Sequence, residues 1–146
     1  DRQGRDLACL LFGAAAWKTQ PRDEFIGWTA LERQRNLSGV ANNCRFLILP
    51  WVGVPHLASH ILGRVARRIA TDWHEHYGHR VVLLETFVQG DRFRGSCYRA
   101  ANWIRVGWTT GRTRQDRQNK VQAPVKDVYV YPLTPNFRKE LCHVQP

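Results

Sequence analysis

The clearest pattern of hydrophobic and polar positions along the chain lies between Leu57 and Tyr77. Apolar side chains recur there at the spacing of a helix that buries one face. They are Leu57, Ile61, Val65, Ile69 and Trp73. Gly78 follows, and glycine is a common residue just after a helix end. The pattern therefore predicts one long helix, about 31 Å from end to end.

Shorter apolar runs on both sides of this helix predict strands. These runs are Leu7–Ala16, Glu24–Thr29, Arg45–Val52, Arg80–Val88, Ile104–Thr109 and Asp127–Leu133. The first two are expected to pair as a hairpin across the Lys18–Asp23 connection. Arg45–Val52 and Arg80–Val88 are expected to be buried strands, and Asp127–Leu133 alternates as a strand with two different faces does.

The remaining segments predict short helices and loops. Residues 31–43 are polar and end in Asn42-Asn43, which indicates a short helix or a loop. Phe93–Trp103 predicts a second, shorter helix, and Asn136–Cys142 a last helical turn or two. Thr110–Pro124 predicts a polar loop.

Strands that alternate with crossover helices predict an α/β domain with a mixed sheet that includes some parallel pairing. The three strands expected first along the chain and the long helix are expected to form its core.

The length of the chain favours a single domain, residues 1–146, because 146 residues and 43% hydrophobic content suffice for one core. No apolar run approaches the roughly 20 residues of a membrane span. Four cysteines lack CxxC or zinc-finger spacing, so we expect reduced, structural thiols in a cytoplasmic chain. Because methionine is absent, even as an initiator, we expect a fragment or a trimmed N-terminus.

Charge changes this picture most. The chain has 22 Lys and Arg but only 12 Asp and Glu, which gives a net charge of +10. Such an excess favours a polyanionic partner: DNA, RNA or an acidic membrane surface. Nine Lys and Arg lie between Arg92 and Lys126, against one acid, Asp116, with aromatic residues interleaved. Arginine binds phosphates through two hydrogen bonds and stacks on bases. The predicted nucleic-acid-binding residues are Arg94, Arg99, Arg105, Arg112, Arg114 and Arg117.

Two alternatives to a phosphate-binding surface stay open. The basic stretch after residue 92 can be a solvated loop that gathers counterions. Arg64, Arg67 and Arg68 lie off the apolar face of the long helix, and such a group on its own is more often just a solvated face.

The order strand, sharp turn, long helix, strand, short helix resembles the core of the GNAT acyltransferase fold. The residues that carry this resemblance are Ile48–Leu62, with Pro50 and Gly53 in the turn, and Cys97–Trp103. It implies a GNAT-like mixed sheet and Tyr98 as a general acid. Glu85, on the strand after the long helix, is a weaker candidate base that is expected to face the same groove, or else to pair with an arginine as part of the structure.

The same resemblance implies that the turn residues Val54, His56, Leu57 and Ala58 would bind the pyrophosphate of an acyl-CoA. This turn is a poor cradle. Pro55 has no N–H to donate, the β-carbons of its neighbours obstruct close approach, and Gly53 stands where an arginine would meet a phosphate. We therefore expect no cofactor, and a turn that only packs the strand onto the helix stays an alternative.

Over most of its length the chain also resembles the DruA-type family. The matching segments are Phe12–Lys18, Phe25–Trp28, Arg45–Val52, Leu57–His60, Leu84–Val88, Phe93–Trp103 and Val128–Leu133. The string Cys97-Tyr98-Arg99-Ala100-Ala101-Asn102-Trp103 is the most specific of them. The resemblance implies a link to the Druantia anti-phage system and to bacterial transposase genes.

The histidines predict no metal site. His56 and His60 stand four residues apart, a spacing that can bind zinc, but no HExxH motif is present. Nucleophile elbows, phosphate-binding loops and paired-carboxylate nuclease motifs are absent from the sequence as well.

The sequence therefore predicts a nucleic-acid-binding module of a defence or mobile-element protein, with DNA favoured over RNA and little base specificity. The alternative is an acyl- or aminoacyl-type transferase that acts on a nucleic-acid base or a protein amine, with Tyr98 as acid and Glu85 as base. A third reading is a structural domain that binds partner proteins of a defence or transposition system.

Overall fold

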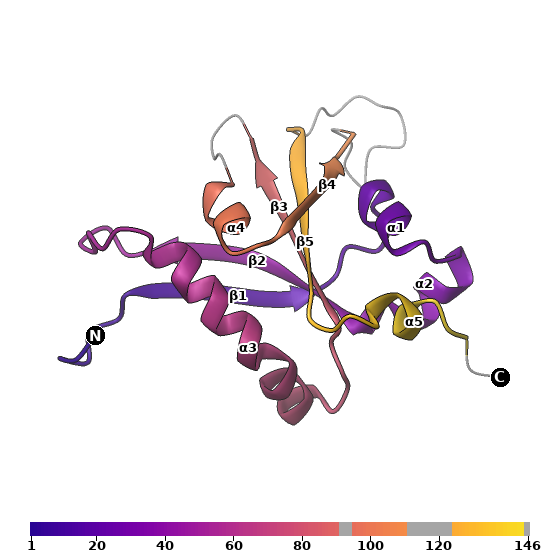
Figure 1. Ribbon diagram of the computed structural model, residues 1–146, viewed down its shortest axis with the longest axis horizontal. Helices are drawn as coiled ribbons and strands as arrows, with labels where there is room; N and C mark the ends of the chain where they lie inside the picture. Colours follow the sequence, from indigo (N-terminus) through magenta and orange to yellow (C-terminus); the bar gives the residue numbers. More distant parts are fainter. Residues whose placement is uncertain (91–94, 111–123, 145–146) are drawn as a thin grey trace.

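A computed structural model describes residues 1–90, 95–110 and 124–144 of the chain. These residues form a mixed five-stranded sheet with the order β1-β2-β3-β5-β4 (Figure 1). The strands are β1 (Ala8–Ala14), β2 (Val40–Ile48), β3 (Leu83–Gln89), β4 (Ile104–Trp108) and β5 (Lys126–Pro132). Strands β2 and β3 are parallel and the other neighbours are antiparallel. The predicted α/β class is confirmed.

The long helix α3 (Leu57–Tyr77) connects the two parallel strands and has the bounds that the apolar pattern predicts. Gly78 ends it in the left-handed conformation, with φ 75°. Leu62 and Ile69 of α3 are buried in one core with Leu84 of β3 and Tyr98 of the short helix α4 (Ser96–Ala100). Helices α3 and α4 therefore cover the same face of the sheet.

A second core fills the opposite face of the sheet. There α1 (Gln20–Ile26) and α5 (Phe137–Leu141) contribute buried residues that pack with β3 and β5, and Leu37 of the 3-10 turn Leu37–Gly39 packs against the same core. Helix α2 (Ala30–Asn36) has no buried residue and contacts α5 (Figure 1). Ile26, Leu83, Val130, Phe137 and Leu141 are buried in this core. The sheet is thus enclosed between two layers of helices over its centre, around β3.

The predicted strand at Glu24–Thr29, and with it the N-terminal hairpin, is wrong. Residues 20–26 form α1 instead, with Pro21 in its first turn and Gly27 ending it at φ 80°. Arg22 and Ile26 are four residues apart and both buried, which is helical spacing. The core consequently contains two of the three expected N-terminal strands.

Strand β2 begins earlier than predicted and is less buried at its end. Val40, Ala41 and Asn43 are its buried residues, whereas Arg45 and Leu47, in the segment predicted to be buried, are exposed. Asn43 belongs to the segment 31–43, which predicts a short helix or a loop, but it lies in β2. Its side-chain amide donates to the carbonyl oxygens of Leu11 (3.2 Å) and Arg45 (3.0 Å). These bonds hold a bulge at which the β1–β2 register shifts.

The second predicted helix is shorter than Phe93–Trp103. It covers Ser96–Ala100, between Gly95 at φ 65° and Asn102 at φ 68°. The strands predicted at Arg80–Val88, Ile104–Thr109 and Asp127–Leu133 and the helical turn at Asn136–Cys142 are confirmed within a few residues. Most of the loop predicted at Thr110–Pro124 lies outside the described residues.

The four cysteines are free thiols, as predicted. Cys9 and Cys44 are exposed, however, so they are not residues of the core. In the described part of the chain, no helix is both long enough and apolar enough to cross a membrane.

Candidate functional site

A cavity of about 650 Å³ lies where the parallel strands β2 and β3 part from each other. The two strands pair only from Val40 to Asn42 on β2 and from Leu83 to Glu85 on β3. Beyond these pairs the strands diverge, and α4 with Tyr98 borders the space between them. The cavity is therefore built by the parallel crossover itself, as ligand sites in α/β sheets commonly are.

Tyr98 lies at the edge of this cavity, held by the bulged part of β2. Its hydroxyl donates a short hydrogen bond of 2.6 Å to Oδ1 of Asn43. The Thr86 hydroxyl donates to the backbone carbonyl of Asn43 at 2.9 Å, which ties β3 to the same point. Burial raises the pKa of Tyr98 to about 12, so the phenol stays protonated at neutral pH.

Glu85, the predicted base, lies on the other face of β3. Neighbouring strand residues point to opposite faces, and Thr86 is the one that faces Asn43 and the Tyr98 side. Neither Glu85 nor its partner Arg22 has an exposed side chain, and Nη1 of Arg22 lies 2.9 Å from Oε2 of Glu85. The structure thus does not bring Glu85 and Tyr98 together.

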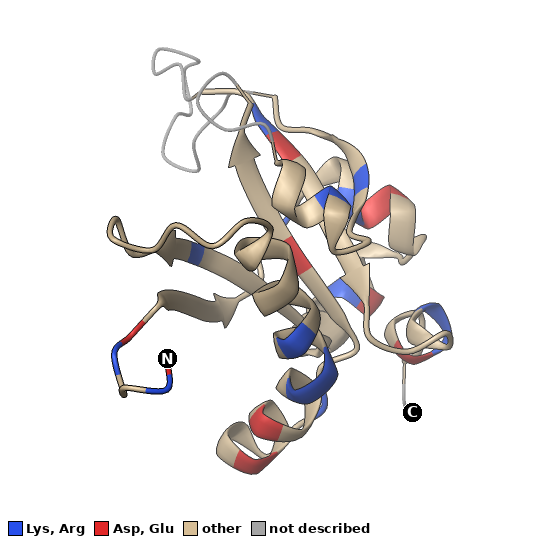
Figure 2. Cartoon of the chain, turned by 60° about the vertical axis from the view of Figure 1, so that its left-hand side comes forward, with Lys and Arg blue, Asp and Glu red and all other residues tan. Residues whose placement is uncertain are grey.

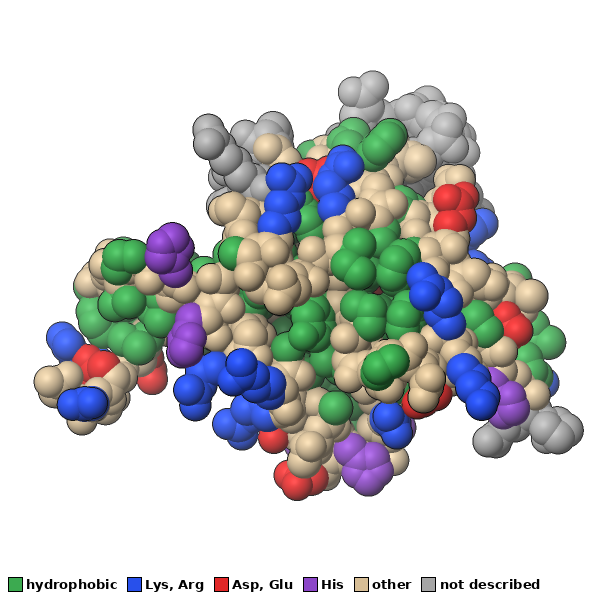
Figure 3. All heavy atoms as spheres, viewed as in Figure 1, with side chains coloured by type: hydrophobic (Ala, Val, Ile, Leu, Met, Phe, Trp, Pro, Cys, Tyr) green, Lys and Arg blue, Asp and Glu red, His purple; other side chains and the backbone are tan. Residues whose placement is uncertain are grey.

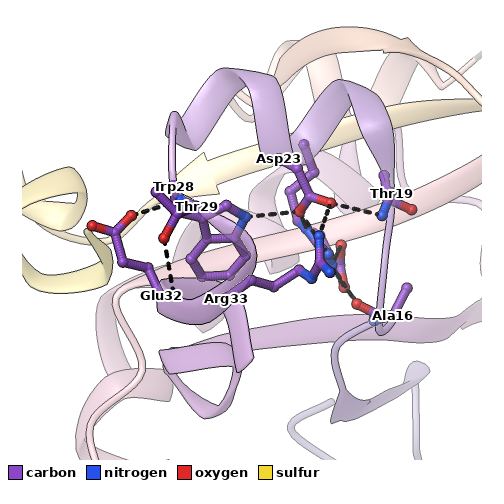
Figure 4. Close-up of polar contacts among 9 residues, drawn as sticks. Ala16, Thr19, Asp23, Trp28, Thr29, Glu32 and Arg33 are labelled. Carbon is purple, nitrogen blue, oxygen red and sulfur yellow. Dashed lines mark hydrogen bonds and ion pairs between the residues drawn. The ribbon is translucent and has the colours of Figure 1, made fainter. Parts of the chain in front are cut away.

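A polar network surrounds Arg22, and Figure 4 labels its members Ala16, Asp23 and Trp28. Nη1 of Arg22 also donates to the carbonyl of Ala16 (2.7 Å), and the Ala16 N–H donates to Glu85 (2.8 Å). Oδ1 of Asp23 accepts from Nη2 of Arg22 and from the Trp28 indole, both at 2.9 Å. Burial raises the pKa of Glu85, while the Arg22 guanidinium lowers it. This network fastens α1 to the sheet.

Two of the predicted nucleic-acid-binding arginines are within the described residues. Nε and Nη2 of Arg105 donate to Oδ1 of Asp127 at 3.0 and 2.7 Å. Nε of Arg99 donates to the hydroxyl of Tyr129 at 3.0 Å. Both arginines are exposed at the surface, yet each is already engaged within the protein. Arg94, Arg112, Arg114 and Arg117 lie outside the described residues.

The predicted cofactor turn leads directly into α3. His56 caps the helix in the left-handed conformation, with φ 58°, and Val54 is exposed. Leu57 and Ala58 form the first turn of α3 and are half-buried. Of the four predicted residues, His56 alone borders a different hollow, between α3 and α4.

This second hollow, which we call the α3–α4 groove, measures about 430 Å³. Its basic and titratable lining residues come from α3 and its cap: His56, His60, Arg64 and Arg67. Asn102 and Tyr131 form part of the facing wall. In the sequence alone, these histidines are considered for a metal site and these arginines for a solvated face. The four-residue spacing of His56, His60 and Arg64 is the sequence signal that places them on one side of the helix.

No metal centre is evident among the described residues, since no three His, Cys, Asp or Glu side chains gather there in a way that could hold an ion.

Taken together, the fold and its surface define a basic α/β domain with one cavity at the strand divergence and one cationic groove beside it. Residues 1–123 match the family model described as Druantia protein DruA, and the chain therefore belongs to the DruA family. This membership associates the chain with the Druantia defence system. A search among curated proteins finds no match to the chain.

Proposed function

We propose that this chain is a DNA-binding module of a Druantia defence protein, which contacts backbone phosphates without reading the base sequence. The observation that carries the proposal is a positive charge for which the protein has no internal counterpart. The net charge is +10. Within the described residues, the carboxylates already held in ion pairs are Asp1, Asp23, Asp72, Glu85, Asp127 and Glu140.

The surplus cations gather on the surface over α3 and near α4 and β4 (Figures 2 and 3). Acidic side chains of α3 lie toward its C-terminal end, at Asp72 and Glu75. A surface of this kind attracts a polyanion over distances of about 10 Å at ordinary salt. Contacts of arginine to phosphates carry no sequence information, so we expect equal affinity for unrelated sequences.

Binding of labelled duplexes measured by fluorescence anisotropy tests this function. Two unrelated sequences of about 20 base pairs and one matching single strand serve as probes. About six phosphate contacts would give a slope of about −5 for log K against log salt, equal for both duplexes. An affinity that does not change with salt, or that differs tenfold between the two duplexes, would overturn the proposal.

We propose that the protein acts in the cytoplasm. We also propose that it acts together with other proteins of a defence or transposition system. The free thiols support this, because disulfides are rare in reducing compartments. Pull-down of the intact chain from its host with the other proteins of its system would test it.

A second candidate is an acyl- or aminoacyl-type transferase, favoured by the cavity at the strand divergence. The β2–α3–β3 unit with parting strands is the arrangement that a GNAT-like core implies. Tyr98 borders that cavity, and its hydroxyl keeps its proton at neutral pH, as a general acid requires. The Tyr98 hydroxyl donates to Asn43 at 2.6 Å, and this hydrogen bond would have to break before the hydroxyl could protonate a substrate.

The turn before α3 does not fit the pyrophosphate of coenzyme A. Pro55 lacks an N–H, and His56 has a left-handed backbone at the helix cap, with φ 58°, so we expect the turn to be a poor cradle for phosphates. Thermal shift with CoA and acetyl-CoA checks this. Ligand at 100 times its dissociation constant would add about 2.7 kcal/mol of stability, whereas we expect no shift.

A further inference from the structure

The α3 side of the α3–α4 groove carries four basic or titratable side chains, beside Ser59 and Gly63. His56, His60, Arg64 and Arg67 follow one another at intervals of four, four and three residues, so they share one stripe of the helix. Figure 3 shows His and Arg side chains near one another over α3, which contains no lysine. The apolar stripe of the same helix, with Leu62 and Ile69, is turned into the core.

None of the described residues that line this groove carries a carboxylate. Among the described residues, no carboxylate oxygen lies within 4.0 Å of a guanidinium nitrogen of Arg64 or Arg67. Their neighbour Arg68 differs, because its Nε lies 2.7 Å from Oδ2 of Asp72. Arg80 likewise lies 3.4 Å from Glu140. Arg64 and Arg67 thus keep their donors available for an external anion.

The opposite wall offers different groups. Tyr131 is half-buried, and its ring packs against Trp103 with the centroids 5.9 Å apart, which fixes its position. Asn102 is exposed beside it, with its backbone in the left-handed conformation. An aromatic ring and an amide opposite a cationic stripe suit a ligand that carries both phosphates and rings.

We propose that the α3–α4 groove is the main site at which the described part of the chain holds the nucleic-acid backbone, with Arg64 and Arg67 on neighbouring phosphates of one strand. The inference rests on the proposed function, and it places the phosphate contacts of the described residues on α3 instead of at Arg99 and Arg105. Arg99 and Arg105, predicted from the sequence, donate to Tyr129 and Asp127, whereas Arg64 and Arg67 face an open groove. Phosphates need charge-assisted donors of this kind.

The test compares two double variants that remove the same charge. Arg64→Ala with Arg67→Ala empties the groove of its guanidinium groups, and Arg68→Ala with Arg80→Ala is the matched control outside it. The probe is the labelled 20-base-pair duplex. Two lost phosphate contacts make the salt slope shallower by about 2 and lower the affinity about a hundredfold at about 50 mM salt. The control is expected to lose far less.

A third variant, Arg64→Lys with Arg67→Lys, keeps the charge and should retain most of the affinity, which separates charge from any change of fold. Equal losses in the groove variant and its control would overturn the groove while leaving nucleic-acid binding intact. Failure of the unmodified chain to bind duplex or single strand would overturn both proposals. Displacement of the duplex by micromolar CoA would indicate that the groove binds a small nucleotide ligand. That result would also overturn the proposal that the groove holds the nucleic-acid backbone.

Discussion

Arg22 of α1 and Glu85 of β3 form an ion pair in which both side chains are fully shielded from solvent. Nη1 of Arg22 lies 2.9 Å from Oε2 of Glu85. They stand 63 positions apart in the chain. Arg22 additionally binds the Ala16 carbonyl and Asp23. The pair is thus the polar fastening between the first helix and the centre of the sheet.

Removal of Arg22 should destabilise the protein severely. Arg22→Met leaves the Glu85 carboxylate buried without its cation, which costs roughly 3–5 kcal/mol for pairs of this kind. The double variant Arg22→Met with Glu85→Leu should lose less free energy of unfolding than the sum of the losses in the two single variants, because no unpaired charge stays buried. Urea unfolding of the four proteins measures this. A loss below about 1 kcal/mol in Arg22→Met would contradict the structural role.

The pKa of Tyr98 gives a pH dependence of stability with a definite sign. The pKa is raised from its ordinary 10.0 to about 12 in the folded protein, so the folded state holds this proton more tightly than the unfolded state. The stabilisation is complete below pH 10 and is lost as the pH rises from 10 to 12. Two pKa units at about 1.4 kcal/mol each amount to roughly 3 kcal/mol.

The Tyr98→Phe variant isolates this contribution, because it cannot ionise. The stability difference between the original protein and Tyr98→Phe should shrink between pH 9 and 11.5 in urea unfolding. A difference that stays constant over this range would show that the phenol titrates alike in both states. Asn43 loses its donor in this variant at every pH, so that cost cancels in the comparison.

Gly95 should tolerate no side chain. Its φ is +65°, and a β-carbon there would lie 2.8 Å from the hydroxyl of the buried Tyr129. Gly95→Ala is therefore expected to cost roughly 2–4 kcal/mol, through backbone strain and displacement of Tyr129. Gly63→Ala is the control: it lies within α3 with open space around it and should gain roughly 0.5–1 kcal/mol. Similar melting temperatures for both variants would refute the expectation.

How far the sequence predicts the fold depends on whether local or distant residues decide each element. The bounds of α3 follow from its own apolar period and from Gly78, and they were predicted correctly. Residues 20–26 were misassigned because their buried helical face includes Arg22, whose partner Glu85 is distant in sequence. The pattern of residues 31–43 predicts a short helix or a loop at Asn43, because its amide partners, Leu11 and Arg45, are positioned only by the bulge between β1 and β2.

The same distinction applies to the candidate site. Strand alternation shows that Glu85 and Thr86 face opposite sides, but only the folded chain shows which side Tyr98 takes. The stripe that includes His60 and Arg64 is visible in the sequence at helical spacing. Its significance depends on Tyr131, which reaches the groove from β5.

Charge reversal in the basic stretch should weaken binding to every DNA sequence alike. Arg112 and Arg114 lie outside the described residues, so the expectation follows from the sequence, in which nine Lys and Arg between Arg92 and Lys126 face one acid. Phosphates are identical at every base pair, so contacts to them position a protein without selecting a sequence. Arg112→Glu with Arg114→Glu should therefore lower the affinity for two unrelated duplexes by the same factor, at least tenfold at about 50 mM salt.

The matched control for this variant reverses two charges at the N-terminus, Arg2→Glu with Arg5→Glu. Arg5 is already paired with Asp1 at 2.7 Å, so its reversal changes the net charge without removing an available donor. Anisotropy titrations of both variants against both duplexes separate local contacts from overall charge. A loss confined to one duplex would mean that the basic stretch reads bases, and an equal loss in the control would mean that only the net charge attracts DNA.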